Sequence, residues 1–258
     1  MIVGFDHVVI AVADLAAETE LFTGAGFHVV PGGSHRGRGT HNAVIALDNG
    51  YLELISVADR YLALRFGGNP ARAVRFLETS PRGVMGYAVT AAGIEDDVRR
   101  LEQGGYAPSG PTSVSRERTD GSVIGWRLAV PRGESWGRSW PFLIEWDRPE
   151  FSPASDATEH SNGITRVTGL SITTTDVNDA VQLYRDGLGL PVTHETPTGF
   201  RAALGGDVTV DLEAGASTTM DSVVLSGPGV GRSAALDELA LLYGSVLRLQ
   251  PDPAAGNA

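Results

Sequence analysis

The pattern of apolar and polar positions divides residues 1–60 into five elements. Residues 5–12 form a β-branched run, which is typical of a buried strand. Asp14 predicts the N-cap of the following helix, because its side chain can accept hydrogen bonds from the first free backbone N–H groups. Residues 27–30 predict a second strand, and residues 42–47 and 51–57 predict a hairpin with Asn49-Gly50 in its turn. The order is one strand, one helix and three strands.

The same order recurs further along the chain. His7 is 19 positions before Gly26, and Gly86 is again 19 positions before Gly105. A third copy begins at Gly169, with one residue inserted in its helix. A recurring spacing of this kind indicates an internal repeat. We therefore expect an α+β fold of tandem βαβββ modules.

The repeats divide the chain into regions. Modules at 1–60 and 82–147 are expected to pair and to form the active-site region, 1–147. Residues 148–163 are rich in Pro, Ser, Asp and Glu, which predicts a linker. Residues 164–250 hold the third module, with an extra strand at 222–226 and a helix at 234–247, and 251–258 form a tail.

Composition narrows the choice of partners and of chemistry. The formal net charge of −11 repels phosphate backbones and anionic lipid, so we expect neither nucleic acid nor a membrane as partner. The absence of cysteine excludes disulfides, thiolate metal sites and a Cys nucleophile. The N-terminus has no basic leader and no apolar run is long enough for a membrane span, which predicts a cytoplasmic protein.

Ordered motifs run through the first 147 positions: Phe5-Asp6-His7-Val8-Val9, Gly32-Gly33-Ser34-His35, Gly39-Thr40-His41-Asn42-Ala43, Tyr51-Leu52-Glu53-Leu54-Ile55, Asp120-Gly121 with Trp126-Arg127, and Pro141-Phe142-Leu143-Ile144-Glu145-Trp146. Each motif alone is unspecific. As an ordered set they resemble the glyoxalase-like branch of the vicinal oxygen chelate superfamily, which includes glyoxalases, bleomycin-resistance proteins and dioxygenases.

This resemblance implies a curved, partly closed barrel of mixed β-sheet with flanking helices and a divalent metal inside. By position, it implies His7, Glu53 and Glu145 as metal ligands, with Glu145 also serving as a catalytic base. The fourth ligand position holds Gly86, which has no side chain to donate. Nitrogen and oxygen donors suit Mn, Fe, Zn, Ni or Mg, so the identity of the metal stays open, and so does whether a metal is bound.

Strand alternation leaves two interpretations of these residues. Tyr51, Glu53 and Ile55 share one face of their strand, and Glu53 either faces water or belongs to an interior site. His7 is either a ligand or a hydrogen-bonded core histidine. In the glycine-rich loop at 32–42, His41 is the candidate for catalysis, while His35 and Asn42 are candidates for substrate binding. The alternative is a mobile surface loop.

Two further groups are candidates for substrate binding. Arg116, Arg118 and Arg127 flank a turn and either hold an anionic substrate or form ion pairs within a solvated hairpin. Four tryptophans gather around the loop at 131–140 and either line a cleft or pack beneath that loop: Trp126, Trp136, Trp140 and Trp146. Among them, Trp126 and Arg127 lie within the motifs of the resemblance.

Two functions remain open. The first is a metal-dependent enzyme acting on a small oxygenated molecule, as a lyase, isomerase, epimerase or dioxygenase. The second is a protein that binds and sequesters a small molecule without metal, which Gly86 and the tryptophan cluster favour. The third module has Gly169 at the first ligand position, with Asp211 and Glu213 near the last one. We expect it to pack on the first two modules or to pair across a homodimer.

Overall fold

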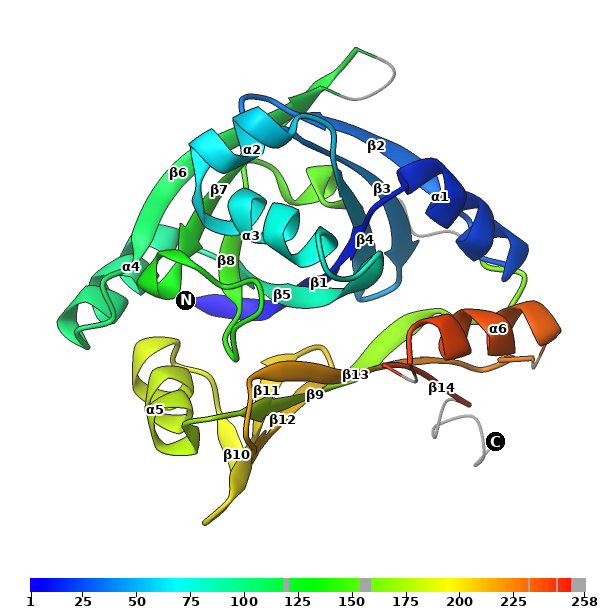
Figure 1. Ribbon diagram of the computed structural model, residues 1–258. Helices are drawn as coiled ribbons and strands as arrows, with labels where there is room; N and C mark the ends of the chain where they lie inside the picture. Colours follow the sequence, from blue (N-terminus) through cyan, green and yellow to red (C-terminus); the bar gives the residue numbers. More distant parts are fainter. Residues whose placement is uncertain (118–120, 154–158, 232, 245, 252–258) are drawn as a thin grey trace.

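The computed structural model consists of two β-layers, a closed barrel and an open sheet that lies against it (Figure 1). It describes residues 1–117, 121–153, 159–231, 233–244 and 246–251. Arg118, Asp120, the middle of the expected linker and the tail from 252 onward lie outside the described residues. No helix in the described ranges is long and apolar enough to span a bilayer.

The first module has the expected order of elements. Its bounds are β1 (Ile2–Val12), α1 (Leu15–Gly24), β2 (Val30–His35), β3 (Thr40–Leu47) and β4 (Gly50–Val57). Asp14 is the N-cap of α1, as predicted, and accepts hydrogen bonds from the backbone N–H groups of Ala16 and Ala17. The predicted hairpin is also confirmed, with Leu47 paired to Gly50 across its turn.

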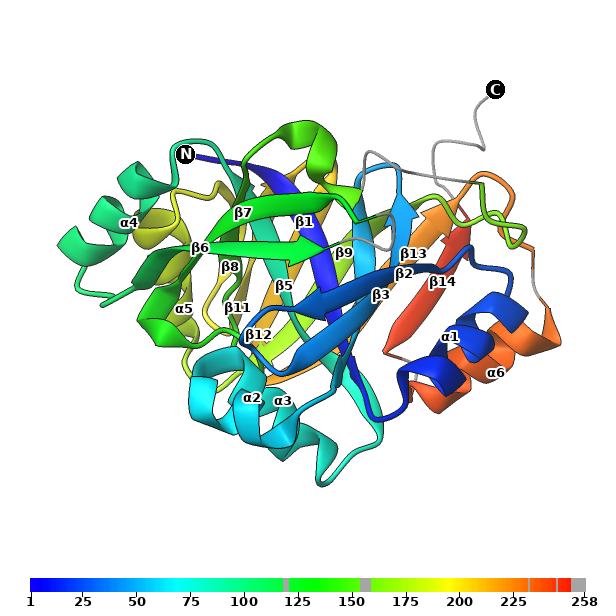
Figure 2. The same cartoon turned by 90° about the horizontal axis from the view of Figure 1, so that it is seen from above.

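A pair of helices separates the first module from the second. They are α2 (Arg60–Phe66) and α3 (Gly68–Leu77), and in Figure 2 they lie at one end of the barrel strands. Gly39 has a positive φ of 71° and lies so close to this segment that a Cβ on it would be 2.4 Å from the carbonyl oxygen of Asp59. Glycine is required there because both the backbone conformation and the close approach exclude a side chain.

The second module repeats the first. Its bounds are β5 (Arg82–Ala91), α4 (Ile94–Gln103), β6 (Ser109–Glu117), β7 (Val123–Val130) and β8 (Phe142–Trp146). A short 3-10 turn, η1 (Pro131–Gly133), begins the loop between β7 and β8.

The two modules close into an eight-stranded barrel with the order β1-β4-β3-β2-β6-β7-β8-β5. β1 and β5 pair antiparallel along most of their length, while β2 and β6 are joined at His35 and Arg116. Each module also contains one parallel pair, β1 with β4 and β5 with β8. The α+β class and the curved mixed sheet expected from the sequence are therefore confirmed, and the ring of strands is complete.

The third module forms the second layer together with two further strands and one helix that follow it in the chain. Its bounds are β9 (Arg166–Thr174), α5 (Val177–Gln182), β10 (Val192–Thr196), β11 (Gly199–Gly205) and β12 (Val208–Ala214). β13 (Thr219–Gly227), α6 (Ala234–Leu242) and β14 (Leu247–Pro251) follow, and the six strands form a sheet in the order β10-β11-β12-β9-β13-β14. The helix predicted at 234–247 is shorter than expected, because Leu247 begins a strand that pairs parallel with β13.

The residue inserted in the third module has a structural counterpart. After α5 the chain continues as a π-helical turn, Leu183–Gly187, before it reaches Gly189. A π-turn takes up one residue more than an α-turn of the same length. The extra residue is therefore absorbed within the helix.

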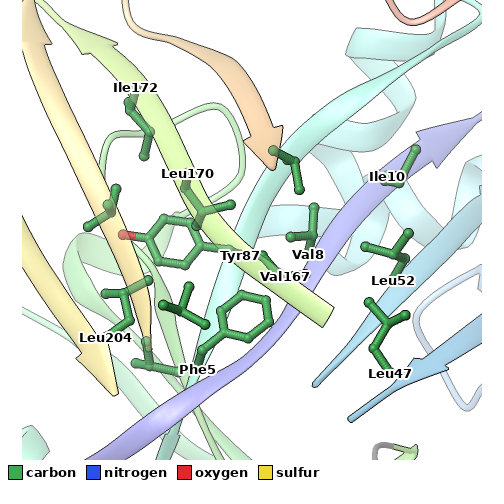
Figure 3. Packing of buried hydrophobic residues seen from close by; sticks show 14 of the residues in the cluster. Phe5, Val8, Ile10, Leu47, Leu52, Tyr87, Val167, Leu170, Ile172 and Leu204 are labelled. Carbon is green, nitrogen blue, oxygen red and sulfur yellow. The ribbon is translucent and has the colours of Figure 1, made fainter. Parts of the chain in front are cut away.

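Most of the apolar core lies between the barrel and the second sheet (Figure 3). Val8 and Ile10 on the outer face of β1 pack in the same cluster as Leu170 and Ile172 on β9. Tyr87 and Tyr184 are both buried there, and their hydroxyl groups are hydrogen-bonded to each other. The third module thus packs on the first two, which was one of its two expected roles. A second and smaller apolar cluster fills part of the barrel interior.

The described part of the expected linker is held against the barrel. His160 accepts a hydrogen bond from the backbone N–H of His28 at 3.0 Å and bonds the carbonyl of Ala46 at 3.0 Å. Asn162 donates to the carbonyl oxygen of Ala25. Both side chains are buried, so this segment fixes the position of the second layer on the first.

Candidate active site

A cavity inside the barrel collects most of the predicted site residues. It encloses about 620 Å³ of empty space, including its open mouth. Its polar wall comes from β1 to β4, the turn between β2 and β3, α3 and β6, and consists of His7, His35, Arg38, Thr40, Asn42, Tyr51, Glu53, Asn69 and Arg116. Its opposite wall is aromatic and includes Trp126, Trp136, Phe142 and Trp146.

Glu53 is the centre of the polar wall. Strand alternation on β4 turns Tyr51, Glu53 and Ile55 into the barrel. Oε1 of Glu53 accepts a hydrogen bond of 2.6 Å from Nδ2 of Asn42. Nε2 of His7 lies 3.6 Å from Oε2, and Nε2 of His35 lies 3.6 Å from Oε1. With 7% of its surface exposed, Glu53 is an interior carboxylate, and the solvent-facing interpretation is wrong.

His7 is oriented by its neighbour in the sequence. Its Nδ1 lies 2.7 Å from Oδ1 of Asp6, and a carboxylate accepts, so Nδ1 donates and the Nε2 of a neutral ring faces Glu53 without a proton. Oδ2 of Asp6 accepts from the hydroxyl of Thr90 and the indole N–H of Trp146. The ring of His7 stacks on Tyr51 with centroids 4.4 Å apart. The position of the imidazole is thus fixed on several sides.

His35 is buried in the same wall and stays neutral at physiological pH. Its Nδ1 is 2.9 Å from the hydroxyl oxygen of Thr40. Burial lowers the pKa of His35 to about 4, against the opposing effect of the Glu53 charge, and the charge of Arg116 lowers it further. His35 therefore adds no positive charge beside Glu53.

Asn42 joins Glu53 to a buried arginine. Its Oδ1 accepts a hydrogen bond from Nη1 of Arg116 at 3.2 Å, while its Nδ2 donates to Glu53. A Cβ on Gly32 would lie 2.0 Å from Oδ1 of Asn42 and 2.8 Å from Nη1 of Arg116. The glycine of the Gly32-Gly33 motif therefore leaves the space that these two side chains occupy.

Three of the four tryptophans line the cavity, as the cleft interpretation predicts. Trp126 and Trp146 lie with ring centroids 5.3 Å apart. Trp136 is held by Asn69 of α3, whose Oδ1 accepts from the backbone N–H groups of Ser135 and Trp136. Trp140 instead packs in the larger core and donates to the carbonyl oxygens of Pro131 and Glu134.

Glu145 is not brought to His7 and Glu53. Phe142, Ile144 and Trp146 on β8 face the cavity, so Glu145 lies on the outer face of the strand. There it is 17% exposed, forms an ion pair with Arg127 and accepts a hydrogen bond of 2.6 Å from the backbone N–H of Gly93, the N-cap of α4. The expected convergence of three ligands is therefore not met.

Two other predicted residues also lie outside the cavity. Arg127, a candidate for substrate binding, pairs with Glu95 and Glu145 on the outer face of β7. His41 does not line the cavity, whereas its neighbours Thr40 and Asn42 do. Both follow from alternation, because adjacent residues of a strand point to opposite faces.

The strand register shows what replaces the ligands of the second module. In the first module Val9 pairs with Glu53, two residues after His7. In the second module Ala88 pairs with Phe142, two residues after Gly86. Phe142, and not Glu145, is therefore the counterpart of Glu53. A Cβ on Gly86 would lie 3.3 Å from Cδ1 of Trp136, so an indole ring occupies the space beside that position.

These positions do not fit the metal centre that the resemblance implies. Two of the four places carry donors, His7 and Glu53, while Gly86 and Phe142 carry none. Within the described ranges, no group of three or more His, Asp or Glu side chains is arranged so that it could hold a metal ion. The chemistry of the wall is better described as a hydrogen-bonded network around one carboxylate.

Several site residues did not stand out in the sequence. Asp6 precedes His7 and by alternation would point away from it, but a register irregularity between Phe5 and His7 brings the two side chains together. Arg38 and Asn69 enter from a loop and from α3, where no strand pattern marks them. The Asp-His pair in the Phe5-Asp6-His7 motif was the one available signal.

Comparisons with known proteins agree with this architecture. A family model described as a glyoxalase-like domain matches residues 5–188, more than two thirds of the chain. No curated protein sequence matches the chain. A hypothetical protein from Staphylococcus aureus has a similar structure, with a TM-score of 0.77 and 16% identity, over 96% of this chain and 99% of that one.

Two other solved structures share the fold. One is a xylose isomerase-like TIM barrel/4-hydroxyphenylpyruvate dioxygenase fusion protein, with a TM-score of 0.56 and 13% identity over 93% of this chain and 39% of that one. The other is a mutant of 4-hydroxymandelate synthase from Streptomyces coelicolor, with a TM-score of 0.51 and 13% identity over 88% of this chain and 71% of that one. At these identities the likeness extends to the fold alone.

Proposed function

Because the chain belongs to the glyoxalase-like domain family of the vicinal oxygen chelate superfamily, we propose that it acts on a small oxygenated molecule in the barrel cavity by proton transfer. The observation that carries this function is the placement of Glu53. Its carboxylate lies inside a largely apolar barrel, between the Nε2 atoms of two histidines that are each held at Nδ1. A confined carboxylate of this kind is suited to act as a general base.

The chemistry assigned to these residues is an isomerisation next to a carbonyl group. Glu53 takes a proton from the carbon beside the carbonyl, and the electron pair of the C–H bond moves to the carbonyl oxygen as an enolate. The buried guanidinium of Arg116 places a positive charge in the same wall, which stabilises that oxygen. The proton then returns to a carbon atom, so no oxidant or reductant is consumed.

His7 has a supporting role in this step. Asp6 holds its ring with Nε2 turned toward Glu53, at 3.6 Å from Oε2. The lone pair of Nε2 can accept the proton from Glu53 and return it to a carbon of the substrate. Because both groups lie in the same wall, the proton leaves and returns on one face of the substrate, as an isomerisation allows.

The step involves no metal ion. The metal-dependent function expected from the resemblance needs donors at the positions of Gly86 and Phe142, which supply none. We therefore assign the proton transfer to Glu53 and His7 themselves.

The test is deuterium exchange in D2O, followed by proton NMR. The probe is butyrophenone, an aryl ketone with a CH2 group beside its carbonyl. We expect the protein to accelerate loss of that CH2 signal, and Glu53→Gln to reduce the acceleration by at least roughly 100-fold, the usual effect of losing a general base. Glu145→Gln is the matched control, since it changes the same residue type outside the cavity and should leave exchange unchanged.

A second function is favoured by one specific observation. Phe142 and three tryptophans give the second module's side of the cavity an apolar wall, and Gly86 adds no donor to it. Such a wall suits a protein that binds and sequesters a flat molecule. Calorimetric titration with the same ketone separates the two functions. Binding without catalysed exchange would support sequestration, whereas exchange that is unchanged in Glu53→Gln would contradict the role given to Glu53.

A further inference from the structure

More arginines than carboxylates line the cavity, although the chain as a whole is acidic. The protein carries a formal net charge of −11, yet the cavity wall contains two arginines, Arg38 and Arg116, and one acidic residue, Glu53. The carboxylate of Asp6 lies behind this lining, where it is bonded to His7 and Trp146. The guanidinium groups are thus the charged groups of the lining that can attract an anion into the cavity.

Of the two arginines, Arg38 is the one that can contact a ligand in the cavity. It lies in the turn between β2 and β3, is half-buried and lines the cavity. Its guanidinium is 4.7 Å from the centre of the Phe66 ring. Among the described residues, no carboxylate lies within ion-pairing distance of it. Burial lowers the pKa of Arg38, with the charge of Glu53 opposing that effect, so the cation is held partly out of water.

The opposite wall selects for a different kind of group. Trp126, Phe142 and Trp146 present aromatic surface there, and flat apolar groups pack well on such surfaces. A ligand with a negatively charged group at one end and a flat apolar body at the other would complement both walls. A carboxylate matches the planar fork of an arginine.

We propose that the ligand of this cavity is a small monocarboxylate with a flat apolar body, and that Arg38 binds its carboxylate. This assignment rests on the proposed function, because it takes the barrel cavity as the ligand site. It adds the substrate class and one residue that determines specificity. Glu53 is then left for the carbonyl-bearing part of the molecule.

A matched pair of probes tests the assignment. 3-Benzoylpropanoate carries a phenyl ring, a carbonyl with an adjacent CH2 group, and a carboxylate. Butyrophenone has the same skeleton with a methyl group in place of the carboxylate. The dissociation constant of each is measured by calorimetry at low and at high salt, and the exchange of the CH2 protons is followed in D2O.

Two variants of the same turn complete the design. Arg38→Gln removes the charge that lines the cavity, while Arg36→Gln removes an exposed charge two positions away that does not line it. We expect wild type to bind the carboxylate at least roughly 10-fold more tightly than the ketone, since hydrogen bonds to charged groups contribute this much. Arg38→Gln should remove that preference, and Arg36→Gln should keep it. Circular dichroism confirms that both variants are folded.

The outcomes separate the two levels of inference. Equal binding of both probes by wild type, or a preference that survives Arg38→Gln, overturns the carboxylate site. If the preference depends on Arg38 but neither probe exchanges, the carboxylate site stands and the proton-transfer function fails. If both probes exchange through Glu53 with equal efficiency, the function stands and the carboxylate site fails. Binding of neither probe overturns the assigned ligand class.

Discussion

His35, one of two buried histidines that line the cavity, makes the stability of this protein depend on pH by an amount that can be worked out. In the unfolded chain His35 titrates near its ordinary pKa of 6.5, and in the folded protein burial lowers the pKa to about 4. Between these two values the unfolded state binds a proton that the folded state does not. Stability must therefore rise with pH across this window and fall as the pH is lowered through it.

The magnitude follows from the two pKa values. At pH 7 both states are almost fully neutral at this residue, so the effect is small. At pH 5 the unfolded chain is protonated and the folded protein is not, which costs about 2 kcal/mol of unfolding free energy relative to pH 7. Below pH 4 the loss levels off at about 3 kcal/mol.

The assay is urea unfolding at several pH values between 7 and 5, followed by tryptophan fluorescence. Trp126 is a suitable reporter because its ring centroid lies 6.4 Å from that of His35. His35→Asn is the control, since an amide can bond Thr40 as Nδ1 does but does not titrate. We expect the pH dependence of the variant to be weaker than that of wild type by about 2 kcal/mol over this range. If both proteins lose stability equally, the inference that His35 is buried and neutral is refuted.

Three further results are expected. Glu145→Ala should lower the unfolding free energy by about 1 kcal/mol, because the N-terminus of α4 loses a hydrogen-bond acceptor. The same variant should leave ligand affinity unchanged in calorimetry, and a loss of affinity would show that Glu145 belongs to the site. Gly86→His should destabilise by about 1–3 kcal/mol in the same urea assay, because its side chain meets Trp136, and an unchanged midpoint would show that the ring can move aside. Protein purified without chelator should contain less than one divalent metal ion per chain by elemental analysis, and its Tm should not respond to EDTA; stoichiometric metal would contradict the assignment of the step to Glu53 and His7 alone.

Part of the predicted residue set coincides with the lining of the cavity. Glu53, His35, Asn42 and Trp126 were predicted as site residues, and all line the cavity together with His7. Strand alternation had separated the two faces for Glu53, whereas His35 was expected in a loop and lies instead at the end of β2. Glu145, His41 and Arg127 were also predicted, but they lie on the opposite faces of their strands. A motif shows that a residue lies in a strand, whereas the position of the barrel axis decides which face is inside.

Local structure was determined by the sequence because its causes are local. Asp14 caps α1, Leu47 pairs with Gly50 across the predicted turn, and the spacing from His7 to Gly26 recurs in the next module. Each of these depends on interactions between residues that are close in the chain. They were sufficient to give the order of the elements and the α+β class.

Only the tertiary structure decided which donors meet. The irregularity in β1 that joins Asp6 to His7, the register that makes Phe142 the counterpart of Glu53, and the indole of Trp136 beside Gly86 all arise from contacts between segments far apart in sequence. A slip of one residue in a strand exchanges its inner and outer faces, and pairing with neighbouring strands is what fixes it. Patterns within single segments could therefore suggest candidate residues for this site. The closure of the barrel determined which of their side chains come into contact.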